Sequence, residues 1–194
     1  MPEGVVQTFI IVIAVLVIGI VIFGFTSALL IPAEAFTIAE HQAAQLASQT
    51  TISVGPLLVS NGQGSLVIEG YDPSYSGYYL VYAFLIPSYL VTSVGVITPN
   101  TQLAVNLPFQ VYLPSKSLAT ETTISSVYDI NGNELYQGSL SVYKIPSNTP
   151  VTILIQNVPN NGKGYYVVIW LIYTNGANSF RIGYAYTGLP SSTG

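Results

Sequence analysis

The sequence has 194 residues, of which only 6 % are charged, and its formal net charge is −4. Soluble domains usually carry about 25 % charged residues. No lysine or arginine precedes Lys116, so the chain lacks a basic surface for phosphate backbones, and we expect no nucleic acid as a partner. The absence of cysteine excludes disulfides, thiolate metal sites and a cysteine nucleophile.

The chain opens with an uncharged, strongly apolar segment that runs from Val5 to Pro32. A bilayer-spanning helix needs roughly 20 apolar residues, whereas the apolar region of a signal peptide has about 7–15. This segment is longer, and the residues before it, Met-Pro-Glu-Gly, carry no positive charge. The pattern therefore favours a membrane anchor or the core of a polymer over a cleaved signal peptide.

Residues 33–49 continue the helical pattern but become amphipathic. Apolar residues recur at spacings of three and four and form one stripe: Phe36, Ala39, Ala43, Leu46 and Ala47. We expect one long helix with a bend near Pro32. At 1.5 Å per residue it spans roughly 65–70 Å, which is about twice the thickness of a bilayer core.

From Thr50 onward the sequence predicts short β-strands separated by Pro, Gly and Asn. The predicted strands are residues 65–70, 78–86, 90–98, 109–113, 122–130, 134–144, 151–156, 164–174 and 179–188. Asn131-Gly132 predicts a hairpin, since this dipeptide suits turns with positive φ. Residues 160–164 and 174–179 predict further tight turns, and the tail 188–194 is expected to be loose.

These patterns define the expected fold class. It is a long N-terminal apolar α-helix followed by an all-β antiparallel sandwich of immunoglobulin-like type, which forms the head domain. We place the hydrophobic helix at residues 1–48 and the extracellular β-sandwich domain at residues 49–194.

Few residues offer catalytic or metal-binding chemistry. His41 is the single histidine and has Gln, Ala and Leu neighbours, so a helical surface or packing role is favoured over a ligand role. Asp129, Asn131 and Asn133 have the spacing of the first ligands of an EF-hand loop. However, Glu134 stands where that loop needs glycine and Leu140 where it needs glutamate. A hairpin turn is therefore the favoured interpretation.

Two carboxylates, Glu69 and Asp72, lie close together in the sequence and could act as a catalytic pair or bind a cation. Asp-Pro-Ser is also ordinary turn chemistry, and no third acid or base lies nearby, so a turn is favoured. Trp170, inside an apolar run, is expected in the core, and the abundant tyrosines are expected to be half-buried on strands. We expect no enzymatic activity, no metal and no cofactor.

The apolar stretch "EGVVQTFIIVIAVLVIGIVIFGF", its amphipathic continuation and a Thr-, Ser- and Tyr-rich β-domain resemble the archaeal type IV pilin-like superfamily. That superfamily includes adhesion pilins, archaellins and archaellar stator-type proteins. The resemblance covers the whole chain in its layout. It implies that a basic leader is removed before the apolar helix, which accounts for the missing basic flank.

The resemblance implies a filament subunit that is inserted in the membrane first and then polymerises with its own copies through the apolar helix. Small residues allow close approach of neighbouring helices. The implied assembly residues are Phe9, Ile13, Leu16, Gly19, Ile20, Phe23, Gly24 and Ser27. Glu3, the N-terminal acid, favours the positive end of the helix dipole and is the expected partner of a neighbouring terminal amine. The head is expected at the cell surface, against the surface layer or glycans.

Alternatives remain open at this point. The chain could be a non-polymerising, membrane-anchored envelope protein of archaellar stator type whose β-domain binds the surface layer. It could also be a viral membrane or capsid protein, or a carbohydrate-binding surface module. Removal of a leader favours the filament subunit, and a retained N-terminus favours the anchor.

Overall fold

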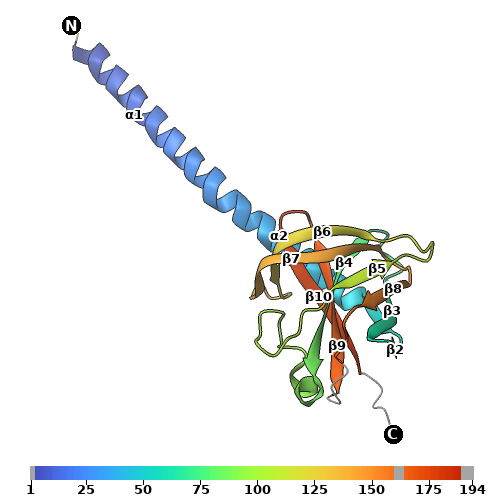
Figure 1. Ribbon diagram of the computed structural model, residues 1–194. Coiled ribbons are helices and arrows are strands. Elements are labelled where there is room, and N and C mark those ends of the chain that lie inside the picture. Colours follow the sequence, from blue (N-terminus) through green and yellow to red (C-terminus); the bar gives the residue numbers. More distant parts are fainter. Residues whose placement is uncertain (1–2, 160–163, 189–194) are drawn as a thin grey trace. The chain divides into compact units, whose positions relative to one another are not determined.

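The structure is a computed structural model that describes residues 3–159 and 164–188. The chain divides into two compact units, with the boundary in the sequence between Ala39 and Glu40. The first unit is helical, and the second contains the strands, most of which are labelled in Figure 1.

Helical structure extends without a break from Glu3 to Gln49. It consists of α1 (Glu3–Phe25), the π-helical turn η1 (Thr26–Leu30) and α2 (Ile31–Gln49). The π-helical turn η1 ends just before Pro32, near which the sequence predicts a bend. Pro32 has no N–H to donate to the carbonyl four residues earlier, and its ring crowds that carbonyl. In η1 the Ile31 N–H instead donates to the Thr26 carbonyl, five residues back, which is the π-helical pattern.

The part of α2 that belongs to the second unit is amphipathic, as the spacing predicted. Ala43 is fully buried, and Leu46 and Ala47 are half-buried. His41 and Gln45 are exposed. The Thr50 N–H donates to the Leu46 carbonyl at 2.8 Å, after which the chain enters the first strand.

One sheet of the β-domain contains four strands in a row and one attached strand. The row is β1 (Thr51–Val54), β3 (Gln63–Tyr71), β8 (Val151–Ile155) and β5 (Phe109–Tyr112), and β2 (Leu58–Ser60) also pairs with β3. All of these pairings are antiparallel. The sequence patterns did not predict the short strands β1 and β2.

The other sheet closes on itself as a barrel (Figure 1). Its strands, in order, are β10 (Ser179–Gly188), β6 (Thr120–Tyr128), β7 (Glu134–Pro146), β4 (Tyr78–Pro87) and β9 (Tyr165–Thr174). The pairings are antiparallel except where β10 meets β6, which are parallel at Phe180 and Tyr128. A long apolar helix followed by an antiparallel all-β domain of two sheets is therefore confirmed.

Irregularities in two strands accompany the closure of the barrel. The register of β10 shifts between Arg181 and Gly183, and that of β6 shifts twice in its second half. Bulges of this kind bend a strand and increase its twist. The shifts lie in the two strands whose pairing closes the barrel, and a sequence pattern of period two specifies neither the shifts nor the closure.

The predicted strand at residues 90–98 is wrong. Its first part belongs to the 3₁₀ helix η2 (Ser88–Ser93), and the rest forms turns. Val94 and Ile97 are buried in the core cluster of the barrel. Val94 and Ile97 thus cover the barrel core from a folded loop, whereas Val96 between them is 78 % exposed. A run of β-branched residues bounded by prolines looks the same in the sequence whether it forms a strand or such a loop.

The core is centred on β4 and β9, which are buried on both faces. Alternate residues of the two strands fill the barrel, among them Phe84 and Trp170, both with no exposed surface. The opposite face packs against β3, where a Cβ on Gly70 would lie 3.0 Å from Leu171 and 3.1 Å from Tyr79. Trp170 in the core is a confirmed prediction.

Candidate functional site

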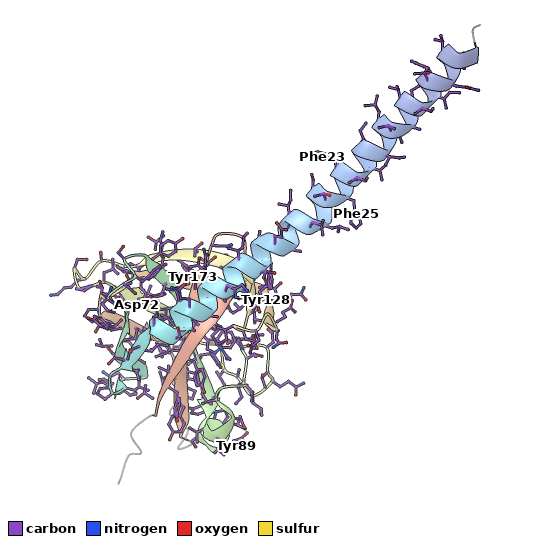
Figure 2. All side chains as sticks on the ribbon, turned by 180° about the vertical axis from the view of Figure 1, so that it is seen from behind. Phe23, Phe25, Asp72, Tyr89, Tyr128 and Tyr173 are labelled. Carbon is purple, nitrogen blue, oxygen red and sulfur yellow. The ribbon has the colours of Figure 1, made fainter. Side chains whose placement is uncertain are left out.

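The predicted assembly residues lie on α1 and η1. Phe9, Ile13, Leu16, Ile20 and Phe23 follow one another at steps of four and three, which places them along one face of α1. Their exposed fractions range from 44 % to 73 %. Figure 2 labels Phe23 and Phe25 on this helix.

The small residues of the predicted set lie on the same half of the helix. A Cβ at Gly19 or Gly24 would meet no atom within 4 Å, so both positions are open. Ser27 lies in the π-helical turn η1 and is half-buried. Glu3 begins α1, and its side chain lies outside the described part of the structure.

The helix is apolar and long enough to cross a bilayer. Its most apolar window has a mean hydropathy of 3.1, and none of that window is buried. Among the described residues it is the one helix with this length and composition, which a signal sequence also satisfies. Each large apolar side chain left in water costs about 1.5–3 kcal/mol relative to burial, so this surface needs lipid or protein to cover it.

Asp72, which the sequence paired with Glu69, serves a turn. Its side chain is 1 % exposed, and Oδ1 accepts hydrogen bonds from the Ser74 N–H at 2.9 Å and the Ser74 hydroxyl at 2.6 Å. Glu69 is half-buried on β3, where it faces Ser53 of β1 in the strand register. The interpretation of Asp-Pro-Ser as turn chemistry is confirmed. Figure 2 labels Asp72.

Asn148 holds this turn in place from a distant part of the chain. Its Oδ1 accepts from the Asp72 N–H at 2.7 Å, and its Nδ2 donates to the carbonyls of Asp72 at 2.8 Å and Tyr75 at 2.9 Å. The backbone of Asn148 is left-handed, with φ of +57°. Asparagine tolerates this conformation better than most residues with a side chain.

Replacing Asn148 by alanine is expected to lower the free energy of unfolding by about 2–4 kcal/mol. The variant loses three hydrogen bonds and leaves the Asp72 N–H without its acceptor. Alanine also pays the full strain of the left-handed backbone, because it lacks the polar side chain that makes this conformation tolerable for asparagine. Asn148→Gly keeps the backbone relaxed and should lose less, by about 1 kcal/mol. Urea unfolding measures both variants, and equal stability of Asn148→Ala and the wild type would contradict the role of this side chain.

Asp129 closes the hairpin between β6 and β7. Its Oδ1 accepts from the backbone N–H groups of Asn131 at 2.9 Å and Asn133 at 2.8 Å, and its Oδ2 accepts from Asn133 Nδ2 at 2.9 Å. Gly132 has a φ of +77°. The predicted hairpin is confirmed. The described residues contain no group of three or more His, Asp or Glu side chains that could hold a metal.

The pKa of Asp129 is lowered by its surroundings. Burial alone would raise this pKa, but the hydrogen bonds from Asn133 and Asn131 and the charge of Arg181 outweigh burial. Because the folded-state pKa is depressed, the stabilisation is present above the unfolded pKa of about 3.9 and is lost as the pH falls below it.

Asp129→Ala is expected to cost about 1 kcal/mol of unfolding free energy at pH 7, because the carboxylate is partly exposed and its bonds compete with water. The deficit relative to the wild type should shrink as the pH falls from 4 towards 2. Urea unfolding across this pH range measures the effect. Glu134→Ala, an exposed acid beside the same turn, is the control and should show no such loss.

Other predicted features have mixed outcomes. The turn at residues 174–179 is confirmed, since Asn175 Oδ1 accepts from the N–H groups of Ala177 and Asn178. His41 is exposed. The predicted turn at 160–164 and the tail lie largely outside the described residues.

The tyrosines differ in burial more than the sequence suggested. Tyr82 is 7 % exposed, and burial raises its pKa to about 12, so its hydroxyl donates to Asn106 Oδ1 at 3.0 Å. The Tyr173 hydroxyl donates to Gln42 Oε1 at 2.9 Å. Tyr89 is 70 % exposed. Some of these rings thus belong to the core, and others form the surface.

Comparisons with known proteins assign no function to these residues. No protein-family model matches the chain, and no curated protein matches it. Among solved structures, the crystal structure of the human F-spondin reeler domain (fragment 1) aligns with a TM-score of 0.31 and 10 % sequence identity. The alignment covers 72 % of this chain and 88 % of that chain. A likeness of this degree carries no functional argument.

Proposed function

We propose that the protein is a non-catalytic structural subunit of an extracellular type IV pilus-like filament of archaea, polymerising through its N-terminal helix. The observation that supports this proposal is the exposure of α1. Its large apolar side chains are exposed over the whole length of the helix, and none of its apolar window is buried. Such a surface requires a partner outside the β-domain.

The helix suits both stages that assembly requires. In the membrane, the apolar side chains of α1 contact lipid tails. On assembly they exchange lipid for contacts with neighbouring helices, and the open positions at Gly19 and Gly24 allow close approach. Outside lipid, a single copy would expose the whole apolar face to water, so the filament is the favoured state.

The head fits the outer surface of such a filament. Its strands carry neutral polar groups and few charges, and we infer that its two sheets belong to the immunoglobulin-like type of sandwich. We place the assembled protein at the cell surface, with adhesion to a surface layer or to glycans as its function. The exposed Tyr89 and Tyr184 are the kind of side chain that stacks on sugars.

A second candidate function is a membrane-anchored, non-polymerising envelope protein of archaellar stator type. The length and hydropathy of α1 support it, because a single helix of this kind holds a domain at a membrane. In that case α1 contacts lipid permanently and its small residues have no assembly role.

Shearing of cells that express the full chain distinguishes the two functions. The released material is examined by electron microscopy with an antibody against the β-domain. Labelled filaments are expected for the pilus-like subunit. Label confined to the membrane pellet would overturn the filament proposal and favour the anchor.

A further inference from the structure

Two buried hydrogen-bond donors inside the barrel lack acceptors. They are the indole Nε1 of Trp170 and the guanidinium Nη1 of Arg181, and each has no partner among the described residues. Trp170 has no exposed surface, and Arg181 is half-buried. Buried polar groups are nearly always paired, and an unpaired one costs free energy, so two neighbouring unpaired donors require an explanation.

The two donors lie on adjacent strands and close together. Trp170 is on β9 and Arg181 on β10, beside the bulge at Gly183. The Arg181 Cζ lies 5.1 Å from the centroid of the Trp170 ring and 5.4 Å from that of the Tyr184 ring. Both distances are within the range of cation–π contacts. The guanidinium contacts the two rings through their faces, and its Nη1 has no hydrogen-bond acceptor among the described residues.

No carboxylate of the described chain forms an ion pair with Arg181. Asp129 attracts the guanidinium from a distance, but both of its oxygens accept hydrogen bonds from the hairpin turn. Burial lowers the pKa of Arg181, although Tyr184 and Asp129 oppose this effect. Arginine nevertheless remains charged in proteins, so the barrel contains a half-buried positive charge without a bonded counter-ion.

We propose that Trp170 Nε1 and Arg181 Nη1 form a binding site for a small monocarboxylate. A carboxylate has two oxygens and one negative charge, which match two donors and one guanidinium. A phosphate carries more charge than one arginine neutralises, and Asp129 nearby repels the excess. The site goes beyond the proposed filament function and does not depend on it.

The site borders the solvent through Tyr184. This side chain is 40 % exposed, and its hydroxyl lies against Gly95, where a Cβ would be 2.8 Å from it. Gly95 belongs to the loop that covers the barrel core, next to the buried Val94. Tyr184, whose ring contacts the guanidinium of Arg181, is thus the partly exposed residue nearest to the donors.

The test uses the full chain in detergent micelles with ¹⁵N-labelled tryptophan. Trp170 is the single tryptophan of the sequence, so the indole N–H gives one resonance. Sodium acetate is added at constant ionic strength, and acetamide, its neutral isostere, is added to a parallel sample. We expect acetate to shift the indole N–H downfield with saturation, whereas acetamide leaves it in place.

Variants separate a specific site from general ionic effects. Arg181→Met is expected to abolish the shift, and Arg181→Lys to weaken binding at least about tenfold, because an ammonium does not offer the planar guanidinium donors. Lys144→Met is the matched control. Lys144 is exposed, and its Nζ lies 3.6 Å from the centroid of the Tyr78 ring, so it also makes a cation–π contact. Loss of the Lys144 charge should leave the acetate shift unchanged.

The titration also identifies the source of the carboxylate. If the shift of the indole N–H resonance depends on the acetate concentration and is independent of the protein concentration, the ligand is a free monocarboxylate. A shift that rises with protein concentration in acetate-free buffer indicates a carboxylate of a second copy at the same site. Absence of any acetate-specific shift in the wild type, with an indole N–H bonded to water instead, overturns the proposal, and so does an unchanged shift in Arg181→Met.

Discussion

Replacing Gly19 and Gly24 together by leucine is expected to leave the chain in the membrane and to abolish labelled filaments. Both positions are open and flank the stripe of large apolar residues, since Gly19 lies one turn before Phe23 and Gly24 one turn after Ile20. Leucine raises the hydropathy of the helix, so membrane insertion is retained. Its side chain prevents the close approach that small residues permit between packed helices. Sheared filaments and the membrane pellet are quantified with the antibody against the β-domain.

Ala14→Leu provides the matched control. Ala14 follows Phe9 by five residues and therefore points about 140° away from it around the helix. Ala14 is exposed. It points about 140° away from Gly19 around the helix and lies about 15 Å from Gly24 along the helix axis, so leucine there adds similar bulk away from both positions. We expect filaments from Ala14→Leu at wild-type abundance, and at least about tenfold fewer from the double variant. If both variants assembled equally well, the face that contains Gly19 would have no special part in assembly.

The outcome for the double variant also separates the two proposed functions. A permanent anchor contacts lipid alone, and lipid adapts to a leucine as readily as to a glycine. The anchor therefore predicts that binding of the head to its target is unchanged. A subunit that packs helix against helix predicts loss of assembly with the protein still in the membrane.

Several features of the fold could be predicted because their signals are local. The length of the apolar run around Ile18 defines α1 irrespective of the rest of the chain. Asn131-Gly132 lies between two alternating runs, which is sufficient to indicate the hairpin of β6 and β7. Pro32 fixes the position of the helix irregularity, since the lost N–H belongs to the residue itself.

Other features depend on contacts between distant residues. The closure of the barrel requires β10 to meet β6 at Phe180 and Tyr128, and no local pattern specifies that pairing. Val94 and Ile97 have strand-like neighbours, yet they cover the barrel core from a loop. The sequence around Arg181 alternates like an ordinary half-exposed strand, so the position of its guanidinium over Trp170 became evident from the register of β9 and β10.

The barrel interior should be the most sensitive part of the head to loss of volume. Phe84 on β4 has no exposed surface, and its ring meets that of Trp170 edge-on, with centroids 5.6 Å apart. It also stacks with Tyr82 at 6.0 Å. Phe84→Ala is expected to lower the free energy of unfolding by about 3–5 kcal/mol, because the variant loses apolar burial and leaves a cavity. Domains of this size are stable by about 5–15 kcal/mol, so the variant retains a small margin.

The loss of unfolding free energy is measured by urea unfolding of the full chain in detergent, followed by the fluorescence of Trp170. The Trp170 ring contacts the ring of Phe84, so the fluorescence reports directly on this part of the core. Tyr89→Ala is the control, because Tyr89 is 70 % exposed and labelled in Figure 2 at the surface of the β-domain. Its effect should stay within about 0.5 kcal/mol. Phe84→Leu keeps most of the volume and should fall between the two. A loss in Phe84→Ala no greater than in Tyr89→Ala would mean that the barrel does not enclose a packed core, and the assignment of β4 and β9 as its centre would fail with it.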